Sequence, residues 1–250
     1  MAIRNAGLEF ESRIPNSEFP IPNSDRVFYT GMALTVVVFV FVGFAPTYYL
    51  RAHFQTTPLP LYLHLHGFAF TAWIVLFTAQ TMLVAARRID VHRRIGWAGA
   101  ALAVLMVVVA ITAAILSGRR DVAAGHEDAA FTFLTTPFLA MVVFMILVGA
   151  AVSYRRRSET HKRLMVLATI SLLDAAVARW PFELVATSAW ALYVLTDLLI
   201  VAAVLYDLAS RRRVHPVYMW GGLLILAGQS LRTVLGQTET WHAIARALLQ

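Results

Sequence analysis

The sequence contains no cysteine, which excludes disulfides, thiolate metal ligands and thiol catalysis together. Charged residues are also scarce, at 14% of the chain against about a quarter in soluble domains. No glycine-rich phosphate loop, nucleophile elbow, HExxH or HxxxH motif occurs. These absences leave no sign of a soluble catalytic domain, and a zinc site would need ligands from separate segments.

Hydrophobic residues, in contrast, make up 59% of the chain, and the mean hydropathy is +0.68. They gather in long runs that each meet the roughly 20 residues a membrane-spanning helix needs. Lipid forces a spanning backbone to satisfy its own hydrogen bonds, so such runs are read as helices. The sequence therefore predicts an all-α polytopic integral membrane protein, a seven-helix transmembrane bundle. The predicted spans are 28–50, 60–84, 95–117, 128–153, 163–181, 187–209 and 217–236.

Two flanking segments complete the expected organisation around the transmembrane domain of 28–236. Residues 1–27 carry prolines and charges without an apolar core, which predicts an extended cytoplasmic tail and not a signal peptide. Residues 237–250 predict a short amphipathic helix on the outer surface, capped by Thr238 or Thr240.

The net charge of +7 and the pI of about 10.2 do not indicate a nucleic-acid partner here. Most cationic residues lie in three loops, "ARRIDVHRR", "YRRRSETHKR" and "SRRRVHP", which follow the second, fourth and sixth predicted helices. Cytoplasmic loops are enriched in Lys and Arg. The pattern predicts a cytoplasmic N-terminus and an outer C-terminus, with the lipid bilayer as the main partner.

The chain contains a single lysine, Lys162, at the edge of a predicted helix. Retinal proteins with seven helices need a lysine midway along the last helix to form a Schiff base. Retinal is therefore excluded as a cofactor.

Histidines stand at helix ends. With the predicted topology, His92 and His161 lie on the cytoplasmic side, while His64, His66 and His126 lie on the outer side. In a helix, residues i and i+2 differ by about 200° around the axis. Only one of His64 and His66 then faces the bundle, and the sequence does not decide which.

The distribution of these histidines resembles that of the di-haem transmembrane cytochrome b family, in which alternate helices each contribute one axial histidine per haem. The segments "HRRIGWAGA" and "HKRLMVLATISLLDAA" also look like an uncharacterised group of bacterial multi-pass proteins, and more distantly like small membrane proteins that assist cytochrome oxidase assembly. The resemblance implies a bacterial inner-membrane location and a haem, copper or zinc ion held between helices. His64 or His66 would bind it with His126 at an outer site, and His92 with His161 at an inner site. Arg179 and Arg232 would neutralise haem propionates or a quinone-like head group.

Ionisable and amide side chains also occur well inside the apolar runs: Asp174, Arg179, Asp197, Gln229 and Arg232. A lone charge at a helix centre costs about 2.5–3.5 kcal/mol on insertion scales, so we expect these groups to pair in a buried network. Their formal charges sum to zero. Thr135, Thr136 and Tyr193 are expected to complete the polar lining.

Three hypotheses follow for the function. The first is a histidine-ligated haem or metal protein in electron transfer or oxidase assembly. The second is a proton- or ion-coupled transporter that uses Asp174, Asp197, Arg179 and Arg232. The third is a non-catalytic subunit or assembly factor that binds other membrane subunits. The sequence assigns no reaction to the chain.

Overall fold

The computed structural model describes residues 22–54, 58–183, 185 and 188–250, and every regular element in this part of the chain is helical. Most of the expected tail of 1–27 lies outside the described residues. The elements are α2 (Asn23–Phe44), the π-helix η1 (Ala45–Tyr49), α3 (Arg51–Phe54), α4 (Leu61–Ala85), α5 (Ile89–Ala123), α6 (Glu127–Ser153), α7 (Ser158–Ile170), α8 (Asp174–Val177), α10 (Ala189–Arg211), α11 (Pro216–Leu235) and α12 (Glu239–Leu249).

Five of the helical segments are long and apolar enough to cross a membrane, judged by length and composition. They are Asn23–Tyr49, Leu61–Ala85, Ile89–Ala123, Glu127–Ser153 and Ala191–Arg211. Their apolar side chains are not all packed inside: Phe68 is 72% exposed, Phe133 65% and Leu205 57%. Apolar surface of this extent on several helices fits contact with lipid chains. The chain is a multi-pass membrane protein.

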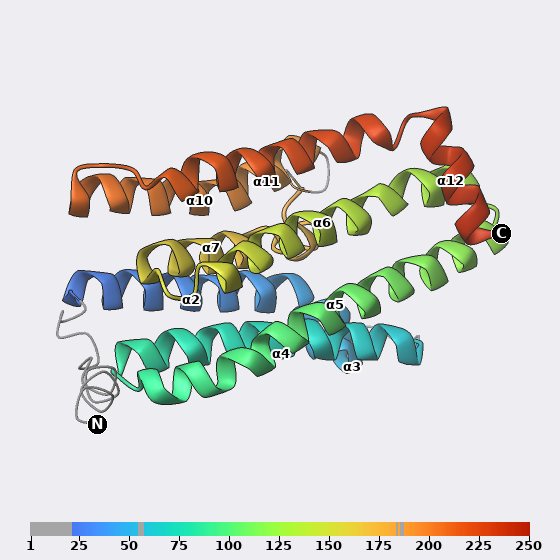
Figure 1. Cartoon of the computed structure of the whole chain (residues 1–250). Helices are drawn as coiled ribbons and strands as arrows, with labels where there is room; N and C mark the ends of the chain where they lie inside the picture. The colour runs from blue at the N-terminus through green and yellow to red at the C-terminus, as the bar shows by residue number, and fades with distance from the viewer. Residues whose placement is uncertain (1–21, 55–57, 184, 186–187) are drawn as a thin grey trace, which may run out of the picture.

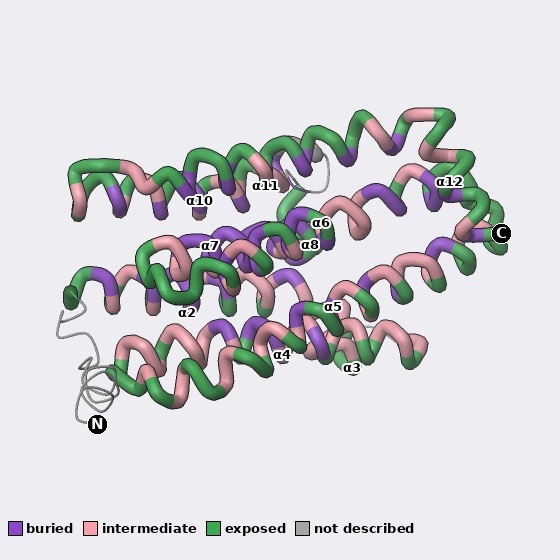
Figure 2. Tube along the Cα trace, in the orientation of Figure 1, coloured by how far each residue is buried: buried purple, intermediate pink, exposed green. Residues whose placement is uncertain are grey.

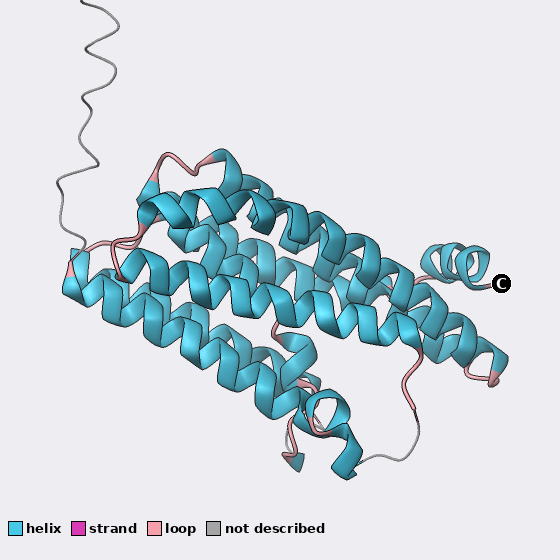
Figure 3. Ribbon diagram, turned by 90° about the horizontal axis from the view of Figure 1, so that it is seen from below, coloured by secondary structure: helices cyan, strands magenta, loops and turns pink. Residues whose placement is uncertain are grey.

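The long helices lie side by side along one direction, and α12 lies across one end of them (Figures 1 and 3). Neighbours in the chain pack together, α4 on α5, α5 on α6 and α6 on α7, while α2 packs against α4 and α8. Figure 2 shows the buried residues on the faces that the helices turn toward one another. The core includes Trp73, Phe144 and Leu167, from three different helices.

The two ends of the bundle differ in charge. At one end, here called the basic end, lie the start of α2, the turns 86–88 and 154–157, and the link 212–215 between α10 and α11 (Figure 1). At the opposite end, here called the far end, lie η1, the link between α5 and α6, and α12. The three arginine-rich loops therefore share one end of the molecule.

The predicted fifth span, 163–181, is not one continuous helix. α7 ends at Ile170, and the chain makes a tight turn before α8 begins at Asp174. In the turn the amides of Leu172 and Leu173 bond the carbonyls of Thr169 and Ile170, at 3.2 and 2.9 Å, which is the i→i−3 pattern of a tightened helix.

The first span also differs from the expected 28–50. Its α-helix begins earlier, at Asn23, and changes to the π-helix η1 at Ala45. Pro46 lies in the first turn of η1, where its missing N–H removes a helical hydrogen bond. Both irregular segments lie toward the middle or far end of the bundle.

α12 covers part of the far end. The Thr238 hydroxyl, not that of Thr240, caps it by accepting from the Trp241 amide at 3.3 Å. The Trp241 indole donates to the Phe131 carbonyl of α6 at 2.8 Å, and Ala245 and Leu249 are buried. The last helix is thus attached to the protein itself as well as lying at its surface.

Candidate functional site

A pocket of about 520 Å3, lined by polar and apolar residues, lies between α6, α10 and α11 at the far end. Its lining includes Asp128 from the first turn of α6 and Gln237 just after α11, which places it at that end of the bundle. The other polar lining residues are Thr132, Thr135, Thr136, Tyr193, Arg232 and Thr233. Hydroxyl groups, one guanidinium and the Asp128 carboxylate offer hydrogen bonds to a polar ligand, and the guanidinium offers a contact for an anionic group.

Arg232 is the cationic group of this pocket, which Asp128 also lines. It lies in the last turn of α11, its side chain is 4% exposed, and its Nη1 donates to Oδ2 of Asp174 at 2.8 Å. The Thr196 hydroxyl of α10 donates to the other carboxylate oxygen at 2.9 Å. Asp174 is the first residue of α8 and directly follows the tightened turn after α7.

Not all of the hydrogen-bond donors of the Arg232 guanidinium have partners. It carries five N–H donors, and its buried Nε has no hydrogen-bond partner among the described residues. The Thr135 hydroxyl bonds the main-chain carbonyl of Arg232 at 3.2 Å, which holds α6 against α11. Pro137, inside α6, cannot donate to the carbonyl of Phe133 four residues earlier. One guanidinium nitrogen beside the pocket therefore lacks a hydrogen-bond partner among the described residues.

A second polar contact joins the same helices. Gln229, one turn before Arg232 on α11, donates to Oδ1 of Asp197 at 3.1 Å. Arg179 does not join this group: it bonds the carbonyl of Ala175 and stacks over the ring of Phe44 at 4.9 Å. The network was expected to be neutral with both arginines, but two carboxylates and one guanidinium carry a formal charge of −1.

The outer histidines are not brought together. α4 begins at Leu61, so His64 and His66 are both helical and point in different directions: His64 is exposed, whereas the His66 ring stacks on Phe70 at 4.3 Å with a buried, unpartnered Nδ1. His126 is exposed at the start of α6. The described residues contain no group of three or more His, Cys, Asp or Glu that could hold a metal ion. The structure therefore does not support a metal at His64, His66 and His126.

The inner histidines, in contrast, are neighbours. The rings of His92 on α5 and His161 on α7 lie 6.2 Å apart between centroids, at an interplanar angle of 79°. A third histidine at the basic end, His215, has a capping role: its Nδ1 accepts from the amide of Val217 at the start of α11.

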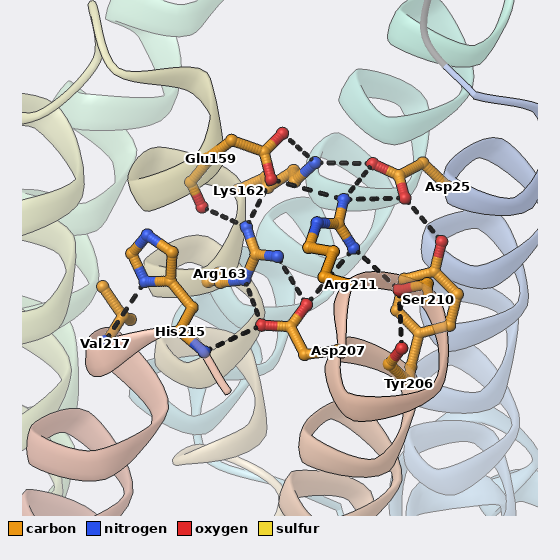
Figure 4. A network of polar contacts seen from close by, with 10 residues as sticks. All are labelled: Asp25, Glu159, Lys162, Arg163, Tyr206, Asp207, Ser210, Arg211, His215 and Val217. Atoms are coloured by element: carbon orange, nitrogen blue, oxygen red, sulfur yellow. Dashed lines mark hydrogen bonds and ion pairs between the residues drawn. The ribbon is translucent and has the colours of Figure 1, made fainter. Parts of the chain in front are cut away.

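A second charged cluster, which the sequence reasoning did not predict, lies at the basic end (Figure 4). It joins the starts of α2 and α7 to the end of α10, and we call it the basic-end network. Its charged members are Asp25, Glu159, Lys162, Arg163, Asp207 and Arg211. Three acids and three bases make it neutral.

The centre of this network is the pair Arg163–Asp207. Both side chains are completely buried, and the guanidinium binds both carboxylate oxygens, at 2.9 and 2.5 Å. The main-chain amide of His215 also donates to Asp207 at 3.1 Å. A bidentate pair with an added donor offsets the large cost of removing two charges from water.

Around the centre, Asp25 joins three helices. It accepts from Lys162 of α7 at 2.6 Å, from Arg211 of α10 at 2.7 Å and from the Tyr206 hydroxyl at 2.5 Å. Burial tends to raise the pKa of Glu159, but hydrogen bonds from Lys162 and Arg163 outweigh it and lower that pKa. Glu159 with Arg163, and Asp207 with Arg211, have the i,i+4 spacing that predicts ion pairs on a helix. These pairs were not predicted from the sequence, because the arginines were interpreted as part of the positively charged loops.

A scan against protein-family models finds no match, and searches of curated proteins and of solved structures find no similar protein.

Proposed function

We propose that this protein is a carrier that binds a small anionic solute at Arg232 and couples its movement to a proton. The observation that carries the proposal is the Arg232 side chain, which is 4% exposed, lines a 520 Å3 pocket and has a buried Nε without a hydrogen-bond partner among the described residues. A carboxylate or phosphate group in the pocket would bind the Arg232 guanidinium through charge-assisted hydrogen bonds. Ionisable groups within a membrane mark substrate or ion pathways.

The charge balance at the site supports proton coupling. Asp174 and Asp197 face only one guanidinium, since Arg179 lies elsewhere. One proton taken up by this pair of carboxylates would neutralise the group before an anion arrives. The break between α7 and α8, directly before Asp174, supports the same conclusion, because transporters place such interrupted helices at their substrate and ion sites.

The proposed topology has seven crossings, with the α7–α8 segment and α11 as the two beyond the five long apolar ones. The arginine-rich turns at the basic end support a cytoplasmic position for that end and for the N-terminus. The far end, with the pocket and the C-terminus, then lies outside. We place the protein in a bacterial inner membrane.

The arrangement of the two ends of the bundle supports an outward-facing state of a carrier. The pocket opens at the far end, while the basic-end network connects α2, α7, α10 and α11 at the other. A carrier that faces outward needs a site open on that side and a closed path on the other. A second cavity of about 600 Å3 is lined by Glu159, Asp207 and Arg211 at the basic end, so the closure would lie deeper than this cavity, at the Arg163–Asp207 pair.

The test uses the full chain in lipid nanodiscs with three probe classes: monocarboxylates, dicarboxylates and inorganic phosphate. Binding is measured by calorimetry at pH 6 and pH 8, and uptake is measured in proteoliposomes. Arg232→Gln removes a charge-assisted contact, for which we expect at least a roughly tenfold weaker binding of the recognised class. Asp174→Asn is expected to abolish the pH dependence of uptake.

Arg120→Gln is the matched control, because Arg120 is also near the far end but its side chain is 57% exposed. Binding in Arg120→Gln should equal that of the unaltered protein. If no probe binds and Arg232 and Asp174 couple only in stability, the carrier proposal is wrong and a non-catalytic subunit or assembly factor remains.

A further inference from the structure

The first helical turns of α5 and α7 lie close together, and each carries a histidine that follows an arginine-rich loop. The rings of His92 and His161 are 6.2 Å apart between centroids. Two imidazoles that share one metal ion, with metal–nitrogen distances of about 2.0–2.1 Å, have ring centroids roughly 5–6 Å apart. The rings would therefore have to approach each other slightly, by up to about 1 Å, to share one ion.

The orientation of His161 is set by a main-chain contact. Its Nδ1 lies 2.8 Å from the carbonyl oxygen of Ala151 on α6. A carbonyl can only accept, so Nδ1 carries the proton and Nε2 of the neutral ring carries a lone pair. Metal-ligating histidines are commonly held by such a bond from their second nitrogen.

Two further polar atoms at this place lack partners. Nδ1 of His92 and Oε1 of Gln80 are both buried, and neither has a hydrogen-bond partner among the described residues. They belong to one cluster, because Nε2 of Gln80 donates to the main-chain carbonyl of His92 at 3.2 Å. A buried polar atom without a hydrogen-bond partner reduces the stability of the fold. Here both an imidazole nitrogen and an amide oxygen are without one.

We propose that His92, His161 and Gln80 form a binding site for a first-row transition-metal ion of the copper or zinc class. Imidazole nitrogen suits both ions. Three protein donors leave one position of a four-coordinate ion open to water or another ligand. Haem ligation would use the two imidazoles alone, so it would give no partner to Gln80. The site is separate from the Arg232 pocket and does not depend on the carrier function.

The test uses the full chain, purified with any polyhistidine tag removed and treated with chelator, and Zn2+ and Cu2+ as separate probes. Metal analysis after gel filtration should give one ion per chain. The electron paramagnetic resonance spectrum of bound Cu2+ should show coupling to two imidazole nitrogens. His92→Phe should leave one nitrogen and weaken binding by at least about 100-fold, since even supporting residues change metal affinity 10- to 100-fold.

Two further variants separate the site from misfolding and from surface binding. Gln80→Glu replaces a neutral donor by a carboxylate and should tighten Zn2+ binding, a gain that loss of fold cannot produce. His126→Gln removes an exposed histidine at the far end and should leave affinity unchanged. Equal affinity in His92→Phe and in the unaltered protein, or a Soret band in the purified protein that His92→Phe removes, would overturn the ion site.

Discussion

At the scale of single residues, Arg163 and Asp207 show how burial decides what a charge does. Each is completely buried, and each is the main partner of the other. Arg88 and Asp90 form a pair of the same charge type at 3.9 Å, with side chains 64% and 62% exposed. Solvent screens the second pair and not the first, so their contributions to stability differ sharply.

Asp207→Ala should therefore destabilise the protein by about 3–5 kcal/mol, because it leaves a buried guanidinium without its counter-charge. Asp90→Ala should change stability by less than about 1 kcal/mol. Both are measured by denaturant unfolding of the protein in mixed micelles. Similar losses of unfolding free energy in the two variants would contradict the conclusion that Arg163 and Asp207 form a buried ion pair.

At the scale of helices, the close approach of α2 to α8 depends on Gly43. A Cβ at this position would overlap the carbonyl oxygen, carbon and Cα of Ala176. The contact is with backbone, which cannot rotate away as a side chain does. α8 begins with Asp174, so this contact also affects the position of the carboxylate that pairs with Arg232.

Gly43→Ala should push α2 and α8 apart and destabilise the bundle by roughly 1–3 kcal/mol, the usual cost of overpacking. The control is Gly31→Ala in the same helix, where a Cβ meets nothing within 4 Å. That variant should be neutral or stabilise the helix by up to about 1 kcal/mol. Thermal unfolding of both compares them directly, and an equal effect would show that α2 does not approach α8 so closely.

At the scale of the whole molecule, the topology is open to a direct labelling test, because the chain has no cysteine of its own. Single cysteines are placed at exposed positions: Arg156 and Arg213 at the basic end, and Ala124 and Glu239 at the far end. A membrane-impermeant maleimide added to intact cells should label Ala124→Cys and Glu239→Cys only.

The Glu239→Cys result tests the last crossing. If α11 did not span the membrane, Glu239 and Arg213 would lie on the same side and would label alike. Labelling of Arg156→Cys from outside would reverse the whole orientation. Lysed cells, in which every position should react, are the control for accessibility.

The basic-end network shows how far prediction from sequence reached. Its arginines were interpreted as loop charges that set orientation, which explains where Arg155–Arg157 lie but not Arg163 and Arg211. Those two point back into the bundle, toward acids on α2 and α10. The partners are separated by 44 and 186 positions in the chain, and a local pattern carries no information about such distances.

The amino-acid sequence by itself determined the class of protein and the approximate positions of the helices. Long apolar runs without competing polar groups have one low-energy structure in lipid, a helix that bonds its own backbone. Only the tertiary structure decided which ionisable groups meet. It put Asp174 with Arg232, placed Arg179 elsewhere and turned His66, not His64, away from solvent. The reason is physical: a break of three residues in one helix, or a rotation of 100° per residue around it, changes the partner of a side chain without changing the hydrophobic pattern.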